Sequence, residues 1–100
     1  MLPAALSMVN NGFQPNYYSI SGTHTTAGDE ILICTADLTI NLSNSSQDRA
    51  RVRVKVDGDY TVTVEGNAQT INGESTIILY LEDTLVDFVY YGELGEWIIE

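Results

Sequence analysis

The strict alternation of apolar and polar residues over short stretches is the feature that most constrains this sequence. Residues 49–56 and 60–64 alternate at every position, and residues 36–42 place three aliphatic side chains on a common side. A period of two residues matches a β-strand with one buried face and does not match the period of a helix. Val, Ile, Thr and Tyr, which favour strands, are abundant. The sequence therefore predicts an all-β protein.

Turn signals divide the chain into short segments. Asp-Gly-Asp at residues 57–59 separates the alternating runs 49–56 and 60–64, which predicts a hairpin between them. Regularly spaced turns and short strands are typical of a β-sandwich. We therefore expect one domain over residues 17–100, an antiparallel β-sandwich of about eight short strands. The expected strands cover residues 17–21, 30–34, 36–42, 49–56, 60–64, 76–81, 85–90 and 96–99.

The first 16 residues have a different pattern. Leu2, Leu6 and Val9 recur at helical spacing, and Pro3 suits the first turn of a helix. The sequence predicts a short N-terminal helical or extended segment over residues 1–16. A helix of this length is marginal alone, so it is expected to dock on its own sheet or on a neighbouring subunit.

Composition excludes several classes of partner. The chain has 14 acidic and 4 basic residues and a net charge of −10, so nucleic acid and anionic membranes are not expected partners. We find no signal-peptide pattern and no apolar stretch of transmembrane length. Cys34 is the only cysteine, which leaves no disulfide within the chain and no thiolate zinc site. A buried, inert thiol is expected there, and no metal or cofactor is predicted.

All basic residues of the chain fall in one segment at a spacing of two. This basic stripe consists of Arg49, Arg51, Arg53 and Lys55. On a strand the four side chains share one face, opposite a row of valines. They could neutralise acids on adjacent strands, with Glu65 the nearest candidate across the expected hairpin. They could also meet an acidic face of another subunit or protein, and both interpretations are kept.

Nothing in the sequence indicates an enzyme. His24 is the only histidine, no nucleophile motif is present, and most carboxylates lie in turns or on polar faces. We expect His24 to be a solvated loop histidine and predict no catalytic residue. Tyr18, Tyr90 and Tyr91 could instead form a stacking surface for a saccharide or a partner protein.

From residue 30 onward the sequence resembles shoulder-type domains of phage tail-fibre and receptor-binding proteins. The resemblance rests on TADLTINL at 35–42, RVRVK at 51–55, YTVTV at 60–64, QTINGES at 69–75 and the closing GEWII at 95–99. Two departures are Ser43, where these domains often carry proline, and YGEL at 91–94 in place of a more polar turn.

The resemblance implies the β-sandwich shoulder domain found in receptor-binding proteins of siphophages that infect Gram-positive bacteria. Such domains are homotrimeric, often follow a short helix, and act as structural mounts, while a separate head binds sugar. We expect no separate head domain within these 100 residues. The implied function is a tail- or capsid-associated virion protein, assembled in the host cytoplasm, that oligomerises and docks on other virion proteins.

The expected contact surface is the basic stripe together with Leu2, Leu6 and Val9. The alternative function is a carbohydrate-recognition module that binds host-surface saccharides through Tyr18, Tyr90 and Tyr91.

Overall fold

A computed structural model describes residues 16–43 and 47–100 of the protein. These residues form strands and turns without a helix, so the all-β prediction is confirmed and no described helix could cross a membrane. The predicted N-terminal helix, with Leu2, Leu6 and Val9, lies outside the described residues. The strands are β1 (Asn16–Ile20), β2 (His24–Thr25), β3 (Glu30–Cys34), β4 (Leu38–Asn41), β5 (Arg51–Val56), β6 (Val62–Glu65), β7 (Thr70–Ile71), β8 (Thr76–Leu79), β9 (Leu85–Tyr91) and β10 (Glu96–Ile99).

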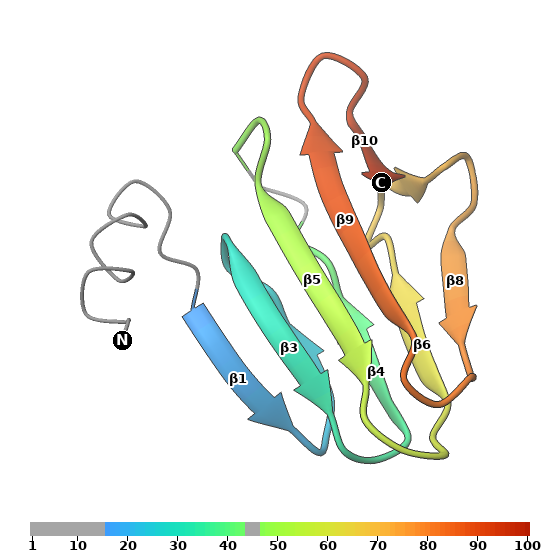
Figure 1. Ribbon diagram of the computed structural model, residues 1–100. Coiled ribbons are helices and arrows are strands. Elements are labelled where there is room, and N and C mark those ends of the chain that lie inside the picture. The colour runs from blue at the N-terminus through green and yellow to red at the C-terminus, as the bar shows by residue number, and fades with distance from the viewer. Residues whose placement is uncertain (1–15, 44–46) are drawn as a thin grey trace.

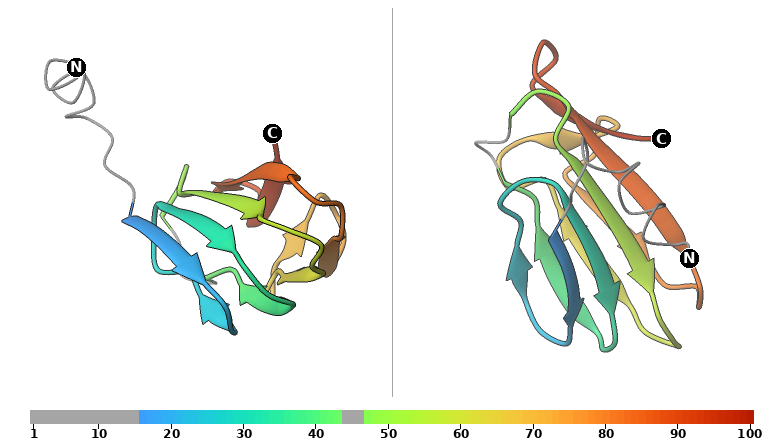
Figure 2. Two further views of the ribbon diagram at one scale, coloured as in Figure 1. Left: turned by 60° about the horizontal axis from the view of Figure 1, so that its bottom comes forward. Right: turned by 60° about the vertical axis from the view of Figure 1, so that its left-hand side comes forward.

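The strands form two sheets that share one core (Figure 1). The six-stranded sheet has the order β1-β3-β5-β9-β10-β7, and the four-stranded sheet has the order β2-β4-β6-β8. From β1 to β9 the chain therefore changes sheet after every strand. Figure 2 shows the two layers from the side.

The prediction of an antiparallel sandwich is wrong, because both sheets are mixed. The pairs β1–β3, β3–β5, β2–β4, β4–β6 and β7–β10 are parallel, whereas β5–β9, β9–β10 and β6–β8 are antiparallel. From β1 to β6 each strand that returns to a sheet runs parallel to the previous strand of that sheet, whereas β8 returns antiparallel to β6. Alternation between sheets thus produces the parallel half of the molecule, and the last strands close it with antiparallel pairs.

The predicted hairpin around residues 57–59 is also wrong. The turn carries the chain from β5 in one sheet to β6 in the other, and the neighbours of β5 are β3 and β9. The valines of β5 and β6 are completely buried, so the two strands face each other across the core instead of pairing edge to edge. Sequence alternation specifies which face is buried, but it does not specify the neighbouring strand.

Large side chains from both layers fill the core. Phe88, Trp97 and Leu32 enter from the six-stranded sheet, and Ile40 and Val64 enter from the four-stranded sheet; all five are fully buried. Cys34 is buried as predicted, and burial raises the pKa of its thiol to about 11. The reactive thiolate form is therefore scarce at neutral pH.

Gly58 provides a test of the turn that crosses between the sheets. Its φ is 138°, and an added Cβ would lie 2.6 Å from Cε2 of Tyr60. We expect Gly58→Ala to lower the free energy of unfolding by about 1–2 kcal/mol, because alanine is strained at this φ. The matched control is Gly22→Ala, where nothing lies within 4 Å of the new Cβ. Urea denaturation of both variants measures the difference, and an equal effect would contradict the turn geometry.

Candidate interaction surfaces

The basic stripe lies on the outer face of the six-stranded sheet. Arg51, Arg53 and Lys55 are on β5 and point away from the core, because the valines between them are fully buried. Arg49 precedes the strand and has a φ of 70°, so it belongs to the turn that leads into β5. The prediction of one shared face is therefore confirmed for the three residues within the strand.

Antiparallel pairing with β9 brings Asp87 directly opposite Arg53. Arg53 Nε donates to Asp87 Oδ1 at 2.7 Å, and Arg53 Nη2 donates to Oδ2 at 3.1 Å, a bidentate arrangement. The hydrogen bond from Arg53 lowers the pKa of Asp87 below its ordinary value, although partial burial opposes this shift. The same bond raises the pKa of Arg53. This pair is the best-formed ion pair of the stripe.

Arg51 and Lys55 pair with Asp87 on β9, with Asp83 in the turn before β9 and with Glu100 after β10. Arg51 donates to Asp87 Oδ2 and to Glu100 Oε1, each at 3.5 Å. Lys55 Nζ donates to Asp83 Oδ1 at 3.2 Å. Since these side chains are partly exposed, each pair contributes up to about 1 kcal/mol.

Arg49 anchors the loop before β5 to the end of β9. Its guanidinium lies 4.4 Å from the ring centroid of Tyr91, a cation–π contact, and its Nε lies 3.9 Å from Asp48 Oδ2. Asp48 Oδ1 accepts a hydrogen bond from the Gly92 amide at 2.8 Å. The Tyr91 hydroxyl donates to Glu100 at 2.6 Å, and this bond raises the pKa of Tyr91.

The prediction that Glu65 pairs with the basic stripe is wrong. Glu65 ends β6 in the other sheet, where it accepts a hydrogen bond from the Thr76 hydroxyl at 2.9 Å. The four basic residues are matched instead by Asp48, Asp83, Asp87 and Glu100. Because the chain holds 14 acidic and 4 basic residues, its net charge of −10 comes from the ten other carboxylates. The charges around β5 on the outer face of the six-stranded sheet are therefore balanced, whereas Glu96 on β10 adds a further carboxylate to the same face.

The three tyrosines of the expected saccharide surface do not lie together. Tyr18 is on β1, which β3 and β5 separate from β9. Tyr90 and Tyr91 are adjacent on β9, so their rings lie on opposite faces of the sheet. The Tyr90 ring packs 5.3 Å from that of Trp97, and its hydroxyl accepts a hydrogen bond from Gln69 Nε2. Tyr90 therefore belongs to the margin of the core.

His24 is not a solvated loop residue, so that prediction is wrong. It lies on β2, and its Nε2 is 2.7 Å from Oε1 of Glu30, whose exposed fraction is only 2%. Glu30 Oε2 accepts a hydrogen bond from the Ala27 amide at 2.7 Å. The Tyr18 ring lies 5.4 Å from the imidazole. The sequence contained one indication of this pair. Glu30 begins the apolar run 30–34, and a carboxylate buried there needs a polar partner.

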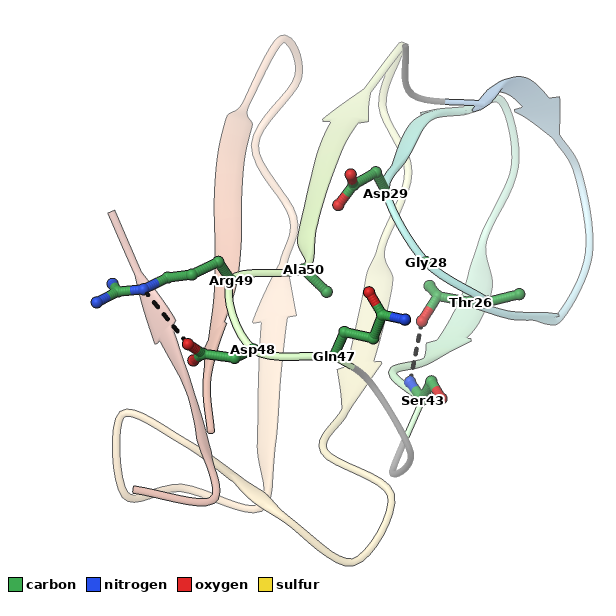
Figure 3. A pocket seen from close by; sticks show the side chains of 9 residues that line it. Thr26, Gly28, Asp29, Ser43, Gln47, Asp48, Arg49 and Ala50 are labelled. Carbon is green, nitrogen blue, oxygen red and sulfur yellow. Dashed lines mark hydrogen bonds and ion pairs between the residues drawn. The ribbon is translucent and has the colours of Figure 1, made fainter. Parts of the chain in front are cut away.

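A hollow of about 590 Å³ lies between the loops that precede β3 and β5 (Figure 3). The described residues that line it are Thr26, Ala27, Gly28, Asp29, Ser43, Gln47, Asp48, Arg49 and Ala50. Asp29 Oδ1 accepts a hydrogen bond from the Arg51 amide, and Thr26 Oγ1 accepts one from the Ser43 amide, both at 2.9 Å. These polar groups thus stabilise the loops. No aromatic ring is among the described lining residues, and we assign the hollow no ligand.

Residues 16–43 and 47–100 contain no group of three or more His, Cys, Asp or Glu side chains placed to hold a metal ion.

Comparisons with known proteins find a similar arrangement of strands but do not identify a family. No family model matches the chain, and no curated protein does. One similar solved structure is described as "Structure of a chaperone-substrate complex", with a TM-score of 0.58 and 11% sequence identity. The match covers 82% of this chain and 14% of that chain. At this identity the similarity concerns the arrangement of strands alone.

The His24–Glu30 pair can be tested through stability. We expect His24→Ala to lower the free energy of unfolding by about 1–3 kcal/mol, because the buried carboxylate loses a hydrogen-bonding partner. Adding Glu30→Gln to this variant should recover part of the loss, since no buried charge then remains. Urea denaturation measures both variants, and a single variant as stable as the parent chain would contradict the assigned role of His24.

The Arg53–Asp87 pair predicts a pH dependence. Because the folded pKa of Asp87 is lowered, its stabilising effect is complete above the ordinary aspartate pKa of about 3.9. The effect is lost as the pH falls through the lower folded value. We therefore expect Asp87→Asn to be less stable than the parent chain at neutral pH, with a difference that shrinks in acid. Urea denaturation across pH tests this, and Asp59→Asn, at an exposed turn position, is the control.

Proposed function

We propose that this chain is a structural component of a phage virion, in the tail or the capsid. It acts by self-association and by docking on other virion proteins, in the manner of a shoulder domain. The virion setting rests on the sequence resemblance over residues 30–100, which also implies a homotrimer assembled in the host cytoplasm.

The observation that carries the proposal is the charge balance around β5 on the outer face of the six-stranded sheet. Two copies of a chain with a net charge of −10 repel each other, so they associate most readily where charge is compensated. Every basic side chain of the protein lies on this face or at its rim, paired with a carboxylate. Ion pairs already formed within one chain also hold the surface in a defined geometry before contact.

Apolar side chains share this outer face with the ion pairs. The strand register places Ile31 beside Arg53, and Ile33 and Leu85 on either side of Lys55. Tyr17 and Ile98 extend the same face toward the two edges of the sheet, through their pairing with Ile31 and Val89. Leu85 and Tyr17 are 57% and 66% exposed. A flat surface of paired charges and exposed apolar side chains suits a protein partner.

We propose no catalytic activity. Among the described residues, the contacts of His24 are the buried carboxylate of Glu30 and the Tyr18 ring, which is an arrangement that supports folding. We also propose no saccharide site, because Tyr18, Tyr90 and Tyr91 lie on separate strands or opposite faces.

Reversal of charge within the stripe tests the proposed surface. We expect Arg51→Glu with Arg53→Glu to lower the degree of self-association, because two new carboxylates then lie beside Asp87. The parent chain should have a solution mass above the 11.0 kDa of one chain, and salt should not lower it, because the ion pairs form within one chain and salt screens the repulsion between copies. Light scattering over a range of salt concentrations measures both masses.

The matched control exchanges the two partners of one ion pair. Arg53→Asp with Asp87→Arg keeps the net charge and the cross-strand attraction, so it should associate like the parent chain. Circular dichroism checks that the strands remain in every variant. If the double glutamate variant folds and associates unchanged, the outer face is not the contact surface.

A further inference from the structure

The edge strands β1 and β2 carry no Asp, Glu, Lys or Arg side chain, and the nearby Glu30 is buried against His24. The sequence contains no Asp, Glu, Lys or Arg before Asp29, so all its charged residues lie in the remaining part of the chain. β1 and β2 belong to the uncharged stretch, and they form the edges of the two sheets on the same side (Figures 1 and 2). A second copy of this acidic chain therefore meets the least repulsion at this end.

Within residues 16–43 and 47–100, the backbone of β1 is open along one side. β1 pairs with β3, and no other strand of the described residues pairs with it. In a parallel ladder, alternate residues direct both backbone groups toward the same neighbour. The Thr35 amide donates to the Ile20 carbonyl at 3.0 Å, so Ile20 and Tyr18 face β3. Tyr17 and Ser19 consequently present their N–H and C=O groups at the open edge.

The other sheet edges are less suited to accept a strand. β2 and β7 have two residues each, which leaves little backbone to pair. β8 has four residues, but it lies between Glu74 and Glu82, so a second copy would bring carboxylates together there. β1 has five residues and contains none of the charges or prolines that protect edge strands from pairing.

Tyrosine rings lie on both sides of the β1 edge. Tyr17, on the outer face, is 66% exposed, and Tyr18, on the inner side beside His24, is 39% exposed. Tyrosine is enriched among the residues that dominate protein interfaces. An added strand would therefore gain contacts above and below its backbone hydrogen bonds.

We infer that β1 is a self-association edge, on which a second copy of this chain pairs its own β1 in antiparallel orientation. A two-fold axis through Tyr18 places Tyr17 opposite Ser19 of the second copy, and the reverse. These are the residues with outward backbone groups, so each of the two pairs exchanges two hydrogen bonds, four in total. The two Tyr18 side chains face each other across the axis. The contact is self-complementary, as a two-fold interface requires.

This inference does not depend on the virion setting or on the stripe. A two-fold contact alone gives a dimer. If the threefold contact implied by the sequence resemblance also forms, the β1 edges join two trimers into a hexamer. The structure therefore assigns an even-numbered assembly in both cases.

The experiment uses the full chain and two substitutions at one position. Ser19→Pro removes the outward N–H without removing a hydrogen bond to β3, and edge strands tolerate proline in this orientation. We expect its dissociation constant to rise about tenfold or more, because two of the four intermolecular hydrogen bonds are lost. Ser19→Ala keeps the N–H and should match the parent chain. Light scattering over a dilution series measures the mass, and circular dichroism verifies the fold.

A second pair of variants applies if the proline variant does not fold. Tyr17→Lys adds a charge at the open edge and should weaken the assembly. Ile78→Lys adds the same charge at an exposed position on β8, away from both this edge and the basic stripe, and should have the smaller effect. Amide hydrogen exchange followed by NMR should show Tyr17 and Ser19 losing protection on dilution, while the core strands keep theirs.

Three results would overturn the inference. The first is a parent chain that is monomeric or trimeric at every concentration. The second is protection of the Tyr17 and Ser19 amides that does not change on dilution, because the edge is then covered within one chain. The third is a folded Ser19→Pro variant that assembles like the parent. An even-numbered assembly that survives charge reversal in the stripe would support the β1 contact and count against the outer face.

Discussion

The inward faces of β5 and β6 are the constraint on which the rest of this structure depends. Val52, Val54 and Val56 from β5, with Val62 and Val64 from β6, are completely buried between the two sheets. Burial of each such side chain favours folding by about 1.5–3 kcal/mol, so these two strands form the centre of the core. β5 also joins the parallel and the antiparallel parts of the six-stranded sheet, because it pairs in parallel with β3 and in antiparallel with β9.

The position of β5 fixes the distribution of charge over the protein. Its outer residues are the basic ones, and antiparallel pairing with β9 places Asp87 beside Arg53, 34 positions away in the sequence. Asp83 and Glu100 approach the same strand from its two ends. The charges around β5 are consequently balanced, and further carboxylates lie away from this strand, as Glu96 does on β10. This separation of a balanced region from an acidic remainder is the physical basis for a preferred orientation of partners.

The opposite edge of the six-stranded sheet offers a different kind of contact. At β1 there is no charge to compensate, and the groups available for pairing belong to the backbone of Tyr17 and Ser19. Behind this edge, Tyr18, His24 and Glu30 close the gap between the two sheets and hold β1 and β2 in place. A contact at the outer face depends on the charges of its side chains, whereas a contact at the β1 edge depends on backbone hydrogen bonds. The two surfaces therefore respond to different substitutions.

The sequence by itself determined which residues face inward and where the basic residues lie. Alternation over residues 49–56 and 60–64 identified the buried valines and the outer arginines, because the period of two is a local property of the strand. It could not identify the neighbours of a strand. A three-residue turn such as 57–59 can connect two strands of a hairpin or two strands in different sheets. Packing of the whole core determines that it connects β5 and β6 in different sheets here. The pairs Arg53–Asp87 and His24–Glu30 followed from that decision, since each joins residues from different strands.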